Sequence, residues 1–116
     1  MDKIGWYDED YFLNGEDIDL CWKIWQLGYK IMYVPRIKIS HYKGAAKGKQ
    51  QKPGVKVSVD RATKRKVLIA GSDAMKIFYN KHYKKKYPFF VTGVVLSGIW
   101  VMKQIRLAKF NLSGKI

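Results

Sequence analysis

The chain has 116 residues, of which 47% are hydrophobic, so it is long enough for one small domain and too apolar to be disordered throughout. A single cysteine, Cys21, excludes an internal disulfide and a cysteine-only metal site, and it suits a reducing cytoplasm. Residues 1–35 carry seven acids against three bases, whereas residues 36–116 carry twenty bases against two acids, for a net charge of +14. A basic segment of this kind favours a polyanionic partner, either nucleic acid or an anionic membrane surface.

The first predicted element is a helix over residues 16–28. Its first turn carries carboxylates where the helix dipole favours negative charge, and Gly28 can end it. A projection at about 100° per residue places Asp17 with the apolar side of this helix and Asp19 with the polar side. We therefore expect Asp17 to be partly desolvated and Asp19 to face water.

Two short strands are predicted over residues 29–42, because apolar residues and His41 alternate with polar ones around a break at Pro35. Residues 43–66 are rich in lysine and glycine and lack apolar periodicity, which predicts a mobile basic loop with a brief strand at 55–59. A second helix is expected from about Val67 to Tyr87. No signal peptide is expected, because residues 1–17 are acidic and polar.

Residues 87–102 contain no charged side chain. A helix of this length spans roughly 24 Å, which is short of the ~30 Å hydrocarbon core of a bilayer. The segment therefore favours a membrane-surface or re-entrant helix over a full span, although an ordinary buried helix is an alternative. Flanking bases and aromatic residues would anchor such a helix, namely Lys84, Lys85, Lys86, Lys103, Arg106, Tyr87, Phe89, Phe90 and Trp100.

The segment 5–44 carries the most specific pattern in the chain. It combines an acidic and aromatic approach, a helix start and a "VP…H..G" ending, formed by Asp8, Glu9, Tyr11, Phe12, Gly15, Glu16, Asp17, Asp19, Leu20, Gly28, Tyr29, Val34, Pro35, His41 and Gly44. This order and spacing resemble the C-terminal catalytic segment of the inverting family-two glycosyltransferases, particularly the rhamnosyltransferase-like group. A weaker similarity continues through residues 78–88.

The resemblance implies a mixed α/β fragment of a GT-A nucleotide-sugar transferase. It divides the chain into a catalytic segment at residues 1–44, a basic loop at 45–66 and a helical, membrane-associating tail at 67–116. The implied enzyme transfers a hexosyl or rhamnosyl group from a nucleotide-diphosphate donor to a saccharide or lipid-linked acceptor during cell-surface polysaccharide synthesis. It would act in the cytoplasm at the inner face of the cell membrane.

The same resemblance implies roles for individual residues. Asp17 would be the general base that takes the acceptor proton, because a carboxylate turned toward the apolar side gains basicity by desolvation. Glu16 would orient the loop or contact the acceptor, and Trp6, Tyr11 and Asp8 would bind the acceptor. His41 would help to coordinate Mg²⁺ or Mn²⁺.

Each role has a structural alternative. Asp17 and Glu16 could serve only as partners of the helix dipole, His41 could be a hydrogen-bonded core histidine, and the aromatic residues could serve only in packing. In the family, the donor diphosphate and its metal are held by an Asp-x-Asp motif that precedes this segment. We do not assign that motif to residues 8–10, so we expect the chain to be inactive by itself.

Two other classes of function remain open. The basic residues 36–116, with the tyrosines interleaved in residues 79–87, could bind nucleic acid, although no nucleic-acid motif is present and the acidic first part argues against it. Alternatively, residues 67–109 could form a small noncatalytic membrane-associated protein.

Overall fold

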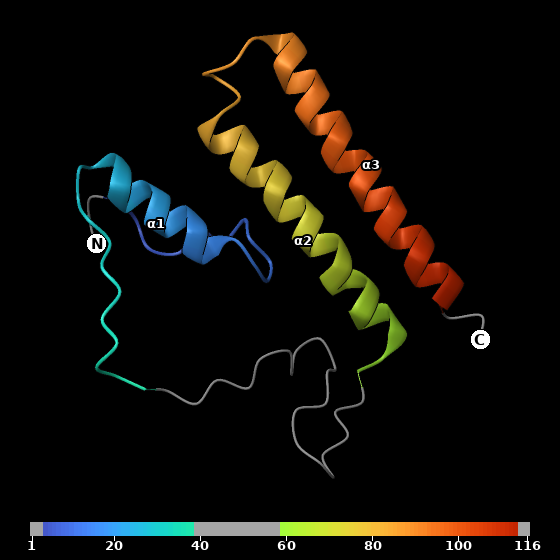
Figure 1. Cartoon of the computed structure of the whole chain (residues 1–116). Helices are drawn as coiled ribbons and strands as arrows, with labels where there is room; N and C mark the ends of the chain where they lie inside the picture. The colour runs from blue at the N-terminus through green and yellow to red at the C-terminus, as the bar shows by residue number, and fades with distance from the viewer. Residues whose placement is uncertain (1–3, 39–58, 114–116) are drawn as a thin grey trace.

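The computed structural model describes residues 4–38 and 59–113, and within these ranges the chain forms three helices (Figure 1). Helix α1 runs over Glu16–Gln26, α2 over Arg61–His82 and α3 over Phe89–Ser113. Helices α2 and α3 lie antiparallel as a hairpin, and α1 lies beside the C-terminal half of α2 (Figure 1).

The expected α/β fold of the GT-A type is wrong, because no strand occurs in the two described ranges. Residues 29–38 were expected to begin two strands, but they are irregular, with a turn at Pro35 and Arg36. A strand needs a neighbouring strand to satisfy its backbone N–H and C=O groups. The described part of the chain offers residues 29–38 no such neighbour. Residues 39–42 lie outside the described residues, as does most of the expected strand at 55–59.

Helix α1 confirms the helix expected near residue 16. Its N-cap, Gly15, has a φ of 107°, a left-handed conformation that favours glycine. A Cβ atom at this position would lie 2.9 Å from the ring of Tyr11. Gly28, with a φ of 81°, follows the last turn and ends the helix as its sequence position indicated.

Helix α2 begins six residues before the expected Val67. Asp60 caps it, because its carboxylate accepts a hydrogen bond of 3.0 Å from the backbone N–H of Thr63. The basic segment that was expected to be a loop through residue 66 therefore contributes the first turns of α2. The helix ends at His82, and a turn over residues 83–87 leads through Pro88 into α3.

Helix α3 has 25 residues, which gives a length of about 37 Å. Among the described residues it is the one helix long and apolar enough, by length and composition, to cross a membrane. The helix is longer than the charge-free segment 87–102, because it continues past Met102 through Lys103 and Arg106 to Ser113. The alternative of an ordinary buried helix disagrees with the structure, because only 11% of the most apolar stretch of α3 is buried.

The hairpin is held together along its whole length. Near the connecting turn, Tyr79 and Thr92 are buried and share a hydrogen bond of 3.2 Å. Farther along, Lys103 donates to Asp73 at 2.7 Å. At the open end, the guanidinium of Arg61 lies 5.4 Å from the ring centre of Phe110. Ser72 and Ile99 are buried on the same faces of α2 and α3 as Tyr79 and Thr92.

Candidate functional site

A buried carboxylate joins the segment that carries the sequence pattern to α2. Asp19 of α1 is fully buried. Its Oδ1 atom accepts a hydrogen bond of 3.1 Å from the hydroxyl of Tyr11 and lies 2.6 Å from Nε2 of His82. Its Oδ2 atom forms a 2.7 Å ion pair with the ammonium of Lys23. Asp19 therefore connects residues 8–12, which we call the approach segment, with α1 and α2.

Burial and charge act in opposite directions on Asp19. Burial raises the pKa of this carboxyl, but hydrogen bonds from Lys23 and His82 and the charge of Lys23 outweigh that effect, so the pKa lies below its ordinary value. Burial, followed by the charge of Asp19, raises the pKa of Tyr11. Asp19 thus stays ionised and Tyr11 neutral at physiological pH. Such a carboxylate is a poor general base, because its partners stabilise the charged form.

A second group of charges surrounds this centre at the surface. Lys81 of α2 forms ion pairs with Asp8 and Asp10, and Lys23 lies 3.6 Å from Asp8. The hydrogen bond from Lys81 lowers the pKa of Asp8, although partial burial opposes it. The desolvation of Lys81 lowers its pKa, but the two carboxylates prevail and raise it. These pairs fasten the approach segment to the end of α2.

Aromatic packing completes the contact between α1 and α2. The ring of Trp22 lies 5.7 Å from Phe78, 5.9 Å from His82 and 5.4 Å from Tyr83, measured between centroids. The ammonium of Lys86 lies 5.7 Å from the Trp22 ring. Packing of this kind stabilises the interface by area burial and, for each ring pair, by about 0.5–1.5 kcal/mol more.

A surface hollow of about 350 Å³ opens just before α1. Its lining combines aromatic and acidic side chains: Tyr7, Asp8, Glu9, Tyr11, Phe12, Leu13 and Glu16. The Oε2 atom of Glu16 is buried and has no hydrogen-bond partner among the described residues. A buried carboxylate oxygen without a partner is costly, so a ligand hydroxyl that donated to it would relieve that cost.

The predicted site residues are only partly brought together. Asp8, Tyr11 and Glu16, expected to contact the acceptor or orient the loop, line this hollow. Trp6 is 66% exposed and is not among the lining residues. His41 lies outside the described residues, so the structure does not test its predicted role as a metal ligand.

The predicted phase of α1 is wrong. Asp17 is exposed, and its Oδ1 atom accepts a 2.8 Å hydrogen bond from the backbone N–H of Ile18. Asp19, expected to face water, is the buried carboxylate. The projection assumed that the apolar side of α1 must be the covered side, but Trp25 remains 61% exposed. The polar side is buried instead, because α2 presents His82 to Asp19 and Phe78 to Trp22. The role of Asp17 as a base stays a prediction.

Sequence reasoning missed His82 and Lys81 as partners of the pattern residues. Both lie more than sixty residues from the carboxylates that they contact. The only signal for such a contact was the opposite charge of residues 1–35 and 36–116. Charge complementarity indicates that two segments attract, but it does not indicate which residues meet.

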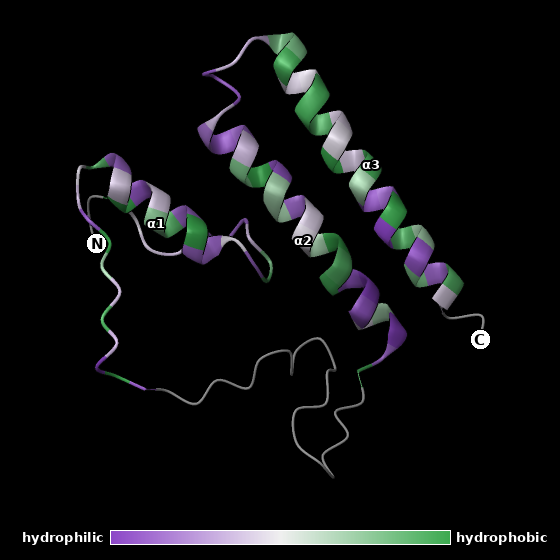
Figure 2. Cartoon of the chain, viewed as in Figure 1, coloured by the Kyte–Doolittle hydropathy of each residue, from purple (hydrophilic) through white to green (hydrophobic). Residues whose placement is uncertain are grey.

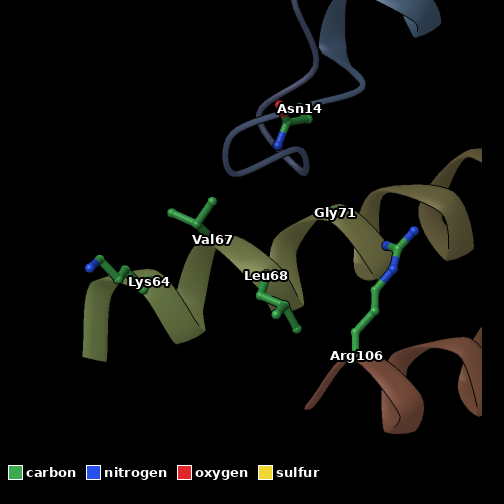
Figure 3. Close-up of a pocket in the computed structure, with 6 residues that line it drawn as sticks. All are labelled: Asn14, Lys64, Val67, Leu68, Gly71 and Arg106. Atoms are coloured by element: carbon green, nitrogen blue, oxygen red, sulfur yellow. The ribbon is translucent and has the colours of Figure 1, made fainter. Parts of the chain in front are cut away.

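A different hollow of about 290 Å³ lies at the open end of the hairpin, lined by Asn14, Lys64, Val67, Leu68, Gly71 and Arg106. Figure 3 shows Arg106 of α3 reaching toward α2 near Gly71, while the side chain of Lys64 points away from Arg106. The two cations do not converge on one point. This arrangement does not have the geometry of a site that clamps a single phosphate.

The described residues contain no group of three or more His, Cys, Asp or Glu side chains placed to hold a metal ion. They therefore do not by themselves form the Mg²⁺ or Mn²⁺ site that the resemblance implies. Comparisons of the chain with protein-family models, with curated proteins and with solved structures found no match.

Proposed function

We propose that this chain supplies the acceptor-binding and catalytic part of an inverting glycosyltransferase that works at a membrane surface in polysaccharide synthesis. One observation carries the proposal: Asp8, Tyr11 and Glu16, which the sequence pattern assigns to the acceptor side, line a single hollow. The hollow supplies aromatic faces for the apolar side of a sugar ring and carboxylates that accept hydrogen bonds from its hydroxyls.

Because Asp17 is exposed, its proposed role as the base rests on its position beside the hollow and not on the desolvation expected from the helical projection. Asp17 is the next residue after Glu16, whose side chain borders the hollow. In the proposed reaction, Asp17 takes the proton of an acceptor hydroxyl, and that oxygen forms a bond to the anomeric carbon. The bond from this carbon to the nucleoside diphosphate breaks, and the diphosphate leaves with the electron pair. A positioned base typically contributes ~10²–10⁴-fold to the rate.

The donor would be held by a part of the enzyme outside this chain. Large apolar side chains remain exposed on α1 and on the segment after it, including Ile18, Trp25, Met32, Tyr33 and Ile37. Large apolar side chains left exposed in this number suit an interface with another part of the enzyme. We propose that the donor-binding part packs against them, which is consistent with the expectation that the isolated chain is inactive.

The test uses the longest natural reading frame that contains this sequence, expressed in membranes and supplied with a panel of radiolabelled nucleotide sugars. We expect transfer to a lipid or saccharide product by the wild type, and a loss of about 10²-fold or more in Asp17→Asn. Asp10→Asn is the matched control, because Asp10 is an exposed carboxylate that does not line the hollow.

Each outcome has a separate meaning. No transfer from any nucleotide sugar by the wild type would reject the proposed activity. Full activity of Asp17→Asn would reject only the assignment of the base. Salt-sensitive binding to DNA without sugar transfer or lipid preference would instead favour a nucleic-acid-binding protein.

A further inference from the structure

The outer face of α3 carries an unbroken run of exposed positions. Phe90, Val94, Val101, Ile105, Ala108 and Leu112 fall within an arc of roughly 60° when the helix is projected at about 100° per residue. All six are exposed, the five larger ones by 46–73%. Ser97 is the one polar residue that shares this face. The outer stripe, as we call these six residues, extends over nearly the whole helix.

The charges of α3 lie away from this stripe. On the same projection, Lys103, Arg106 and Lys109 are about 70° or more from the centre of the outer stripe. Lys103 is paired with Asp73 of α2, and Arg106 reaches toward α2 in Figure 3. Figure 2 shows hydrophobic colour over the first half of α3 and hydrophilic colour on the first turns of α2 and among the later turns of α3.

Residues 59–113 carry twelve lysines and arginines against Asp60 and Asp73. These bases occur at both ends of the hairpin. Lys84–Lys86 lie in the connecting turn, and the first turns of α2 and the end of α3 carry most of the others. An apolar face bordered by bases at both ends complements the hydrocarbon and the anionic headgroups of one leaflet.

The length of α3 would allow it to cross a bilayer, but its packing opposes that orientation. Helix α2 contacts α3 near the turn, in the middle and at the open end. It also carries seven charged side chains among its 22 residues. If α3 crossed the membrane in this arrangement, α2 would be drawn into the hydrocarbon with those charges, which is strongly unfavourable.

We infer that α2 and α3 bind an anionic membrane as a flat hairpin, with the outer stripe of α3 inserted in one leaflet and α2 on its water side. This inference rests on the membrane part of the proposed function and is independent of sugar transfer. It places α1 and the hollow before it on the side of α2 that faces away from the lipid, because α1 and α3 contact opposite sides of α2.

Depth measurements on the full chain distinguish a flat helix from a spanning one. Single cysteines at Phe90, Val101 and Leu112, in a Cys21→Ser background, would carry nitroxide labels on vesicles of three parts phosphatidylcholine to one part phosphatidylglycerol. A flat α3 gives similar, shallow depths for all three labels. A label at Val101 near the bilayer centre, with the other two near opposite surfaces, would overturn the inference.

A matched pair of substitutions tests the outer stripe without labels. Val101→Asp and Asn111→Asp each add one negative charge to an exposed position of α3, but only Val101 lies on the stripe. We expect flotation with the same vesicles to weaken about tenfold or more for Val101→Asp, and clearly less for Asn111→Asp. Equal losses for both variants would mean that the attraction is electrostatic only and would overturn the insertion of the stripe.

Two further results would also reject the inference. Equal binding to pure phosphatidylcholine vesicles at low salt would remove the role of the bases. Self-association in water that Val101→Asp abolishes, without any vesicle binding by the wild type, would show that a second copy of the chain covers the stripe. Neither result bears on sugar transfer, which is measured separately.

Discussion

Helix α2 contacts α1 and α3 through different kinds of side chain. On one side, α1 is attached through a fully buried carboxylate, its three polar partners and a group of aromatic rings. On the other side, α3 is attached mainly by small and apolar residues, with one hydroxyl pair and one half-exposed ion pair. The α1 contact therefore depends on a few specific groups, whereas the α3 contact is distributed along the hairpin and should tolerate single changes.

The largest expected effect is the loss of the buried carboxylate. Asp19→Ala leaves His82 and Lys23 without their anion, and breaking a buried pair in this way typically costs about 3–5 kcal/mol. Hydrogen exchange along the chain should show lost protection in α1 and retained protection in α2 and α3. Asp17→Ala is the control, with an expected change of about 0.5 kcal/mol at this exposed position. Equal effects of the two variants would mean that the contact does not depend on Asp19.

Acid should weaken the same contact selectively. Because the partners of Asp19 hold its pKa below that of a free carboxyl, its contribution to stability is complete above about pH 4 and is lost as the pH falls below that value. The groups that face it are Tyr11, Lys23 and His82. Near-UV circular dichroism should show a transition in this range for the wild type. The same transition in Asp19→Asn would assign it to another group.

Two glycine-to-alanine substitutions, one at the start of α1 and one within α2, should change the free energy of unfolding in opposite directions. Gly15→Ala places a Cβ atom in a left-handed conformation and against the Tyr11 ring, so we expect a destabilisation of about 1–3 kcal/mol. Gly71→Ala fills open space in the middle of α2 and should stabilise the helix by up to about 1 kcal/mol. Urea unfolding of both variants provides the measurement. A destabilising Gly71→Ala would show that the hollow beside it cannot accept a methyl group.

The smallest effect is expected at the ion pair between α2 and α3. The side chains of Asp73 and Lys103 are 46% and 26% exposed, and pairs of this kind contribute about 0–1 kcal/mol. Asp73→Asn should change the free energy of unfolding by about 0.5 kcal/mol or less, and salt should reduce the difference further. A loss as large as that of Asp19→Ala would remove the distinction between the two contacts.

Local sequence patterns predicted where helices form better than they predicted what surrounds those helices. The acidic first turn and Gly28 located α1, and the apolar run after Pro88 located the start of α3. The start of α2 was missed, because the cap at Asp60 precedes a run of bases that lacks apolar periodicity. The end of α3 was missed because charged residues were taken as its limit. Charged side chains do not end a helix when they project to one side of it.

The prediction of strands at residues 29–38 is wrong for a different reason. Alternation at residues 29–38 describes which way side chains would point in a strand, but a strand also needs a neighbouring backbone. The described residues provide none, so the segment is irregular. Site prediction was similarly limited: the pattern selected Asp8, Tyr11 and Glu16, which do meet at one hollow, but it could not identify the partners on α2.

The sequence alone determined that three helices form, the acidic and basic division of the chain, and the apolar character of α3, because these properties depend on neighbouring residues and composition. The tertiary structure decided which side of α1 is buried and which face of α3 is open. A helical projection assumes that polar residues face water, and Asp19 breaks that assumption because Tyr11, Lys23 and His82 replace water around it. His82 is more than sixty residues from Asp19, and local periodicity carries no information about a partner at that separation.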